Sequence, residues 1–361
     1  MKKVTFPHME NLNIPLKAFL REMGLKPVEP PEISRKTLDL GVKYGPEFAC
    51  LPLKYNIGNF IQALEMGAEV ILMGGGIGPC RFGYYGEVQK EILRDLGYDF
   101  EMVSLEPNIF QTFTGLRELF GGIKLKKFYN GGKIAWKKVK NIDRLRESVF
   151  RNRAREIEKG KIDSIYNKYL GEIDNTETVR GVKKTTDEYI KKIKQAVGEN
   201  KRGIEIKVAL VGEIYMLLEP FANLEIAKKL GKLGVTVERR MSLTNWLRHF
   251  IGRDKKENKI YKKAQKYMEI QIGGHACRNI GKTVMYAEEN FDGVIHISPF
   301  TCMPEIVAQM LFPRISKEKD IPVLSLVFDE HTGEAGLITR LEAFVDLIYR
   351  KKLNRKDAVN E

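Results

Sequence analysis

The chain has 361 residues and an apolar fraction of 43%, which suits two globular domains with separate hydrophobic cores. No run of eighteen apolar residues occurs and no apolar stretch follows the first lysines, so the sequence predicts a cytoplasmic protein with neither a transmembrane helix nor a signal peptide. The net charge is +14, and residues 121–203 alone hold 23 Lys and Arg against 11 Asp and Glu.

This basic segment is compatible with nucleic acid, an acidic partner or a phosphate-bearing ligand. It is also compatible with a lysine-rich solvated helical face. Nucleic acid ranks last among the partners, because the aromatic residues that stack on bases are sparse in this segment.

The first hundred residues alternate between short apolar runs and segments of helical periodicity. The alternation predicts strands at 3–6, 48–53, 70–73 and 99–103. It predicts helices at 14–23, 35–44 and 87–96, and a further helix capped by Asn56. Strands separated by helices of about ten residues indicate a parallel sheet.

Residues 108–203 differ, because long charged stretches at 144–159 and 185–197 read as helices. The pairs Gly121-Gly122 and Gly131-Gly132 are expected to interrupt them. From Ile204 the alternation returns, with predicted strands at 206–211, 235–238, 294–297 and 322–328. Helices are predicted at 224–233, 243–251, 258–270, 304–312 and 334–351.

The predicted fold class is therefore α/β, with two flavodoxin-like or Rossmann-like parallel-sheet domains joined by a basic helical segment. The expected boundaries are an N-terminal domain at 1–107, the helical segment at 108–203 and a C-terminal domain at 204–361. A strand, a loop with a cysteine and a helix follow one another near both Cys80 and Cys302, which suggests two related halves.

Four cysteines, two in each predicted domain, are the candidate metal ligands: Cys50, Cys80, Cys277 and Cys302. Structural disulfides are not expected in the cytosol, which leaves small buried hydrophobes or metal ligands. The spacings Cys-x29-Cys and Cys-x24-Cys argue against a zinc ribbon, a thioredoxin-type pair and a ferredoxin-like run.

The setting of these cysteines favours metal ligation. Cys50 is expected near the end of a strand, and the other three just past strands, in loops with Gly or Pro. Such loops line the crevice beyond the carboxyl ends of a parallel sheet, so two facing domains would bring four thiolates into one cleft. Four cysteines suit either a [4Fe–4S] cluster or zinc, and ligands drawn from two domains favour the functional iron–sulfur cluster.

Several other residues stand near these loops. Arg81 and His275 flank cysteines and could donate hydrogen bonds or charge to a bound cluster, or could make structural hydrogen bonds instead. The carboxylates of Glu213 and Glu334 are expected near strand or helix ends, where most such residues cap helices. The Gly74–Gly78 run fits neither a dinucleotide fingerprint nor a P-loop.

Long stretches of the sequence resemble the proteins related to the activases of 2-hydroxyacyl-CoA dehydratases. This family is a relative of the dehydratase and benzoyl-CoA reductase subunits and of the double-cubane cluster proteins. The resemblance rests on TFPHM (5–9), KYGPEFACLPLKYNIGNFIQALEMGAEV (43–70), GPCRFGYYGEVQKEILRDLGY (78–98), GEIYMLLEPFANLEI (212–226), GGHACRNIGKTV (273–284), ISPFTCMPE (297–305) and DEHTGEAGLITRLEAFVD (329–346).

The resemblance implies two flavodoxin-like domains with an iron–sulfur cluster between them, either [4Fe–4S] or a double-cubane [8Fe–9S] cluster shared in a homodimer. It implies a separate ATP-hydrolysing iron–sulfur activase as electron donor, and an acyl-CoA or another small molecule as substrate. The chain departs from the dehydratase pattern of three cysteines per cluster, since four are present. A non-catalytic electron carrier or cluster scaffold is the alternative to an enzyme.

Overall fold

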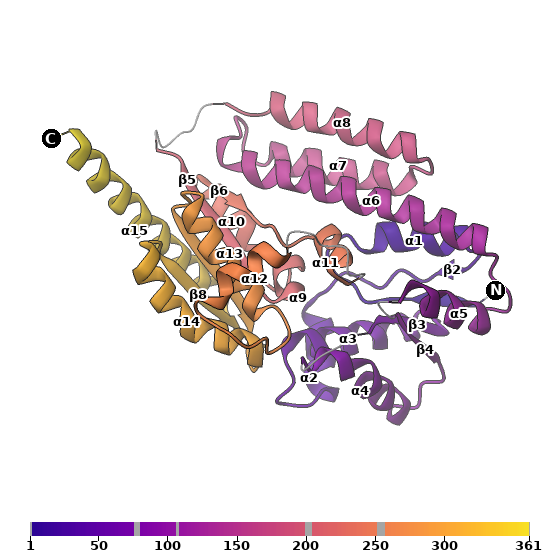
Figure 1. The fold of residues 1–361 in the computed structure, drawn as a ribbon. Helices are drawn as coiled ribbons and strands as arrows, with labels where there is room; N and C mark the ends of the chain where they lie inside the picture. The colour runs from indigo at the N-terminus through magenta and orange to yellow at the C-terminus, as the bar shows by residue number, and fades with distance from the viewer. Residues whose placement is uncertain (1, 76–79, 106–107, 199–203, 251–256, 361) are drawn as a thin grey trace. The chain divides into compact units, whose positions relative to one another are not determined.

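The computed structural model describes residues 2–75, 80–105, 108–198, 204–250 and 257–360 (Figure 1). The chain divides into two compact units, and each contains one four-stranded parallel sheet. The first unit comprises Met1–Asp143, Tyr169–Asp187 and Ser242–Asp254, and the second comprises Arg144–Lys168, Glu188–Met241 and Lys255–Glu361. The predicted α/β class with two parallel sheets is confirmed.

The sheet of the first unit has the order β2-β1-β3-β4, all parallel. Its strands are β1 (Lys3–Thr5), β2 (Lys26–Pro27), β3 (Val70–Gly74) and β4 (Glu101–Leu105). Side chains of β3 alternate between two cores: Val70 and Leu72 pack with α1 (Asn13–Glu22) and α5 (Ile109–Leu119). Ile71 and Met73 pack with α3 (Leu51–Glu65) and α4 (Phe82–Asp95) on the other face.

Helix α3 is buried along almost its whole length, because α2 (Arg35–Tyr44) packs closely against it. Two glycines permit this approach. A Cβ atom on Gly41 would lie 1.8 Å from the carbonyl oxygen of Lys54, and one on Gly58 would lie 1.9 Å from that of Thr37. Neither position can carry a side chain unless the two helices separate.

The segment after β4 is helical, as the charged periodicity predicts, although the helix expected at 144–159 ends at Asn152. Its helices are α6 (Leu125–Asn152), a 3₁₀ turn at Arg153–Arg155, α7 (Lys161–Asn175) and α8 (Val179–Gln195). Gly121 and Gly122 separate α5 from α6 with φ of 65° and 107°. The expected break at Gly131-Gly132 is wrong: α6 runs through both glycines, and Gly131 lets α6 pass close to Phe19 of α1.

The sheet of the second unit has the order β6-β5-β7-β8, again all parallel. Its strands are β5 (Ile206–Gly212), β6 (Val235–Glu238), β7 (Gly293–Pro299) and β8 (Val323–Phe328). Short helices α9 (Ile214–Leu218) and α10 (Ile226–Lys232) follow β5. Helix α11 (Leu243–Phe250) follows β6 and belongs to the first unit.

Helices cover both faces of this second sheet. On one face, α12 (Glu257–Gln265), α13 (Ala276–Glu288) and α14 (Met303–Lys319) share a core with Val294. The neighbouring residue Gly293 faces the opposite side of the sheet. There Phe344 and Ile348 of α15 (Glu334–Asn360) pack against it. The second unit is therefore a three-layered α/β/α arrangement with the strand order of the first.

Three sequence-based expectations near the cysteines are wrong. Residues 48–53 do not form a strand, because the apolar run belongs to α3, which begins at Leu51 and accommodates Pro52 in its first turn. Asn56 lies inside α3 and does not cap it. Cys277 does not follow a strand but lies in the first turn of α13, a helix that the periodicity did not reveal.

Helix boundaries also differ from expectation in places. Helix α4 begins at Phe82, five residues before the expected start, and α12 ends at Gln265, five residues before the expected end. The strands expected at 3–6, 70–73, 99–103, 206–211, 235–238, 294–297 and 322–328 are confirmed, with shifts of one or two residues.

The glycine contact between α2 and α3 gives a stability prediction. Replacing Gly58 with Ala forces the added methyl group into the Thr37 carbonyl and should lower the free energy of unfolding by about 3 kcal/mol. The matched control is Gly132→Ala in α6, where the added methyl meets open space and should stabilise the protein by about 0.5–1 kcal/mol. Chemical denaturation followed by circular dichroism measures both; similar effects of the two variants would contradict the packing argument.

Candidate metal centre

In each sheet, the connections that follow two neighbouring central strands lead in opposite directions. The position between these two strands is the topological switch point of the sheet. In the order β2-β1-β3-β4 this point lies between β1 and β3, and in β6-β5-β7-β8 it lies between β5 and β7. Ligands bind at such switch points, beyond the carboxyl ends of the strands. The chain after β3 reaches Cys80 through residues 76–79, which lie outside the described part of the chain, and the loop after β7 leads to Cys302.

All four cysteines lie at the start of a helix. Cys50 is the N-cap of α3 and Cys302 the N-cap of α14, Cys80 lies two residues before α4, and Cys277 is the second residue of α13. The first backbone N–H groups of a helix have no intrahelical partner and carry the positive end of the helix dipole. The helix dipole at such positions favours a thiolate, although burial opposes this effect at Cys277.

In the first unit, residues at the start of α4 make hydrogen bonds to the segment that carries Cys50. The hydroxyl of Tyr85 lies 2.7 Å from the Sγ of Cys50, and the guanidinium of Arg81 donates to the carbonyl oxygen of Phe48 at 3.2 Å. Burial raises the pKa of the Tyr85 hydroxyl, so this hydroxyl keeps its proton and can donate a hydrogen bond to the Cys50 sulfur. The segments carrying Cys50 and Cys80 are thus linked by two hydrogen bonds from the start of α4.

In the second unit, Cys277 is buried and its thiol donates to the carbonyl oxygen of Ile270 at 3.8 Å. Burial raises the pKa of this thiol, so in the metal-free protein it stays protonated at neutral pH. His275 is the N-cap of α13, but its side chain makes no capping hydrogen bond.

Cys302 closes a tight turn after β7. Its backbone N–H donates to the carbonyl oxygen of Pro299 at 3.2 Å, and Thr301 between them has a φ of 65°. A β-branched residue in the left-handed region is unusual, and such strain is typical of functional loops.

A buried polar network involves residues that closely follow the two cysteines of the second unit, and sequence reasoning did not single it out. Glu305 of α14 accepts from the amide of Asn279 on α13 and lies 2.7 Å from the imidazole of His296 on β7. The signal available in the sequence was a histidine inside the apolar strand Val294–Ile297 and a glutamate three residues after Cys302.

Glu213 lies at the same edge of the second sheet, directly after β5. Its backbone N–H donates to the carbonyl oxygen of Ile297 at 3.0 Å, and its carboxylate caps α9 by accepting from the N–H of Met216 at 2.9 Å. Burial raises the pKa of this carboxyl from 4.5 to about 7, and the nearby charge of Glu305 acts in the same direction. Glu213 can therefore hold or release a proton near neutral pH beside the Cys302 loop.

The structure places two of the predicted ligands in each unit: Cys50 and Cys80 in the first, Cys277 and Cys302 in the second. None of the four is in a disulfide. Among the described residues, no group of three or more His, Cys, Asp or Glu side chains gathers as a metal site.

The described helices include none that is long and apolar enough to cross a membrane.

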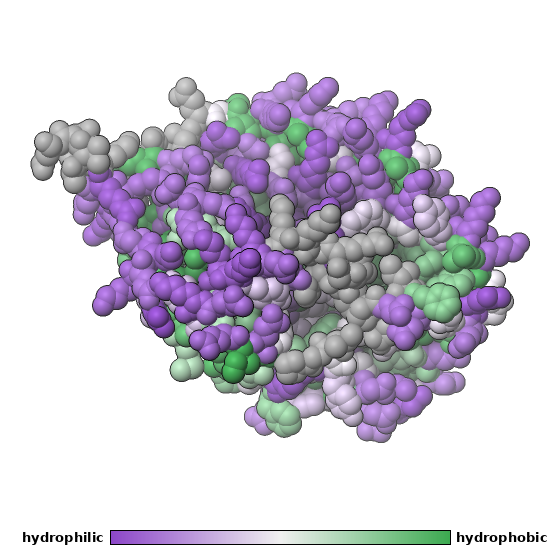
Figure 2. Space-filling view, viewed as in Figure 1, coloured by the Kyte–Doolittle hydropathy of each residue, from purple (hydrophilic) through white to green (hydrophobic). Residues whose placement is uncertain are grey.

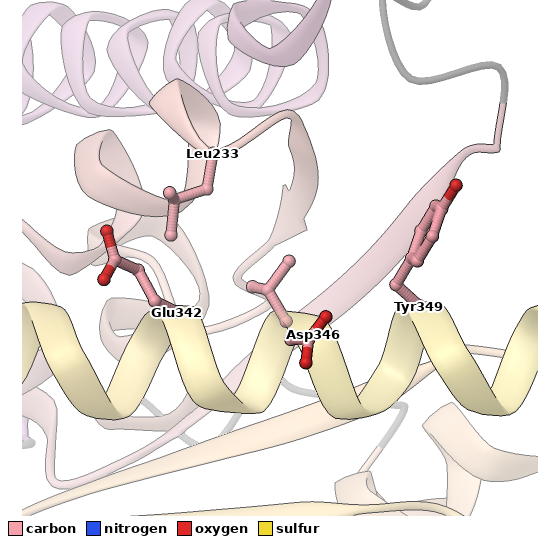
Figure 3. A pocket seen from close by; sticks show the side chains of 5 residues that line it. Leu233, Glu342, Asp346 and Tyr349 are labelled. Carbon is pink, nitrogen blue, oxygen red and sulfur yellow. The ribbon is translucent and has the colours of Figure 1, made fainter.

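A separate pocket of about 490 Å³ lies in the second unit and has no cysteine in its lining (Figure 3). Leu233 and four residues of α15 line it, and Glu342 and Asp346 project from successive turns of that helix (Figure 3). Asp346 already pairs with Arg350 at 2.9 Å. This pocket is distinct from the switch point between β5 and β7.

The fold and the cysteine positions define a protein of two parallel-sheet α/β units in which all four cysteines lie at helix starts. The family model of the 2-hydroxyglutaryl-CoA dehydratase D-component matches residues 135–348, more than half of the chain. The chain belongs to this family. The matched residues include Cys277 and Cys302, while Cys50 and Cys80 precede them. No curated protein matches the chain.

The raised pKa of Glu213 predicts a particular dependence of stability on pH. The folded state binds this proton more tightly than the unfolded state, so the contribution is greatest below pH 4.5 and is lost as pH rises to about 7. Relative to Glu213→Gln, which cannot ionise, the free energy of unfolding of the wild-type protein should fall by up to about 3 kcal/mol across this window.

Denaturant titrations of the metal-free protein at several pH values measure this difference. Glu188→Gln on the exposed side of α8 is the control and should follow the wild-type curve. Parallel curves for the wild type and Glu213→Gln would refute the role of the Glu213 carboxyl.

Proposed function

We propose that this protein is an iron–sulfur redox protein in which Cys50, Cys80, Cys277 and Cys302 bind the cluster, as [4Fe–4S] in the simplest case. In this proposal it receives low-potential electrons from an ATP-hydrolysing iron–sulfur activase and passes them to a small substrate or to a partner protein. The observation that carries the proposal is that all four cysteines are outside disulfides and lie at helix starts.

The residues present suit such a cluster. Thiolates are the ligands of [4Fe–4S] clusters, and four of them complete its coordination. The free N–H groups of helix starts and the hydroxyl of Tyr85 are donors of the kind that hydrogen-bond to cluster sulfurs and tune the potential. The bound cluster would supply one-electron transfer, while the chain supplies the ligands, the donors and the surrounding core.

Membership of the dehydratase D-component family favours iron over zinc, the other metal that four cysteines suit. The ligands also come from sequence positions far apart and from different helices, whereas structural zinc sites typically pair cysteines with two to four residues between them. Both points support a functional cluster. A double-cubane [8Fe–9S] cluster shared between two copies of the chain is the alternative form.

Helix α8 offers a surface for a protein partner. Its apolar side chains Val182, Tyr189 and Ile193 are buried. Its exposed side carries mostly basic residues: Arg180, Lys183, Lys184, Lys191, Lys192 and Lys194. In Figure 2 the surface over α8 is mostly hydrophilic. We propose that this face docks an acidic partner protein such as the electron donor, which predicts binding that weakens with added salt.

The family takes its name from one component of a dehydratase, which favours a second candidate function for this chain. The second candidate is a non-catalytic electron carrier or cluster scaffold within a larger complex. Turnover of a substrate by this protein with an activase and ATP alone would exclude the carrier role.

Metal analysis tests the central proposal. Protein purified without oxygen should be brown and contain about four irons and four acid-labile sulfides per chain, as one [4Fe–4S] cluster requires. Replacing Cys80 or Cys302 with Ala should remove one thiolate and reduce the bound iron and the visible absorption to a small fraction of the wild-type values.

Circular dichroism of the same variants provides the control for folding. Colourless wild-type protein with one zinc per chain would refute the proposal. Unchanged visible spectra in both cysteine variants would show that these thiols are not ligands.

The hydrogen bond from Tyr85 to Cys50 gives a second test. A donor to a ligand sulfur stabilises the reduced, more negative cluster, so Tyr85→Phe should lower the reduction potential. Tyr84→Phe is the matched control, because Tyr84 is the adjacent residue and its side chain is largely exposed. Potentiometric titration followed by EPR measures both potentials, and equal potentials in the two variants would contradict a role for Tyr85.

A further inference from the structure

The buried polar network of the second unit joins the helices that carry its two cysteines. It consists of Asn279, His296 and Glu305, whose exposed fractions are 0%, 0% and 1%. We call it the Glu305 network. All three residues belong to the second unit, so its geometry is complete within one compact body.

Glu305 makes contacts to two different elements. Both of its oxygens accept from the amide nitrogen of Asn279, at 3.0 and 2.9 Å, and Oε2 lies 2.7 Å from Nε2 of His296. With a proton on Nε2, His296 donates to this oxygen. One carboxylate thus connects α14 to α13 and to the central strand β7.

These connections fall beside the cysteines. Asn279 is two residues after Cys277 in the first turns of α13, and Glu305 is three residues after Cys302 in the first turn of α14. A shift of one helix start relative to the other would stretch the hydrogen bonds between Asn279 and Glu305. The network therefore sets how the two helix starts lie relative to each other.

The burial of the network makes this constraint strong. A fully buried carboxylate has no water to replace a lost donor, so breaking a bond to it costs more than at the surface. The Oδ1 atom of Asn279 has no hydrogen-bond partner among the described residues, so the contacts of this amide are made through its donor side. The ring of Phe312 packs against His296, with centroids 4.8 Å apart, and limits its movement.

We propose that Glu305 is the positioning residue that fixes the sulfur atoms of Cys277 and Cys302 relative to each other. The inference rests on the proposed function, because it gives a reason for holding two thiolates at one spacing. It goes beyond that function by assigning to the second unit a preformed pair of ligands, maintained by Glu305 and Asn279.

The test measures the reactivity of each cysteine in the full-length, metal-free protein. Iodoacetamide alkylation followed by peptide mass spectrometry gives a separate rate for each thiol. In Glu305→Gln, Cys277 and Cys302 should react about tenfold faster, because weakened contacts let the helix starts open. Cys50 and Cys80, in the other unit, should keep their rates and serve as internal controls.

Two further variants sharpen the comparison. Glu318→Gln is the matched control: it makes the same substitution on α14, at an exposed carboxylate that pairs with Lys266 and Arg314. Asn279→Ala cuts only the link to α13 and should accelerate Cys277 more than Cys302. This variant also tests the inference if Glu305→Gln does not fold.

A second measurement follows the metal. Anaerobically loaded Glu305→Gln should release iron to a chelator about tenfold faster than Glu318→Gln. A wild-type protein that binds no iron would refute the proposed function, while the alkylation rates would still decide the inference. The inference would be overturned if Cys277 and Cys302 reacted no faster in Glu305→Gln than in Glu318→Gln. A parallel rise in the rates of all four cysteines would overturn it too.

Discussion

The pairing of β5 with β7 is the constraint on which the arrangement of the second unit depends. Gly212 and Ile297 are register partners, and a Cβ atom at Gly212 would lie 1.9 Å from the carbonyl oxygen of Ile297. Only glycine permits this approach, and its φ of 149° turns the chain away from the sheet immediately afterwards. The backbone of Glu213 then bonds to the same carbonyl, which puts Glu213 and the Cys302 loop at one edge of the sheet.

The sheet of the first unit has the same strand order as the sheet of the second unit. In both sheets a cysteine and then a helix follow the second strand at the switch point, which is β3 in the first unit and β7 in the second. The supporting contacts differ. In the first unit a tyrosine hydroxyl contacts a cysteine directly, whereas in the second a carboxylate and an amide connect the helices behind the cysteines.

Much of this fold could be predicted from the sequence. The apolar runs at 70–73, 206–211 and 294–297 predict central strands, because strands of a parallel sheet are buried on both faces and read as continuous apolar segments. The same rule gave a wrong prediction at Cys50, where it predicted a strand at 48–53. The segment from Leu51 is equally apolar because α3 is buried on all sides, and periodicity alone does not distinguish a buried helix from a buried strand.

The site was less accessible to sequence reasoning than the fold. The four cysteines could be selected by residue type and by their place near predicted loops, but their common position at helix starts required the observed boundaries of α3 and α13. The contact between Asn279 and Glu305 joins residues 26 positions apart on different helices, and no local pattern reports such a pair. The roles of Gly41 and Gly58 could not be predicted either, because these glycines permit a contact between two helices and no local sequence pattern marks such a contact.

The position of the cysteines at helix starts has a consequence for the proposed electron transfer. A thiolate on a long loop can move when the charge on its metal changes, and that movement slows each transfer. Cys277 and Cys302 are instead buried at the starts of helices packed into the core of the second unit. For a cluster bound by these sulfurs, oxidation and reduction would displace few heavy atoms, so the reorganisation energy of each electron transfer would be small.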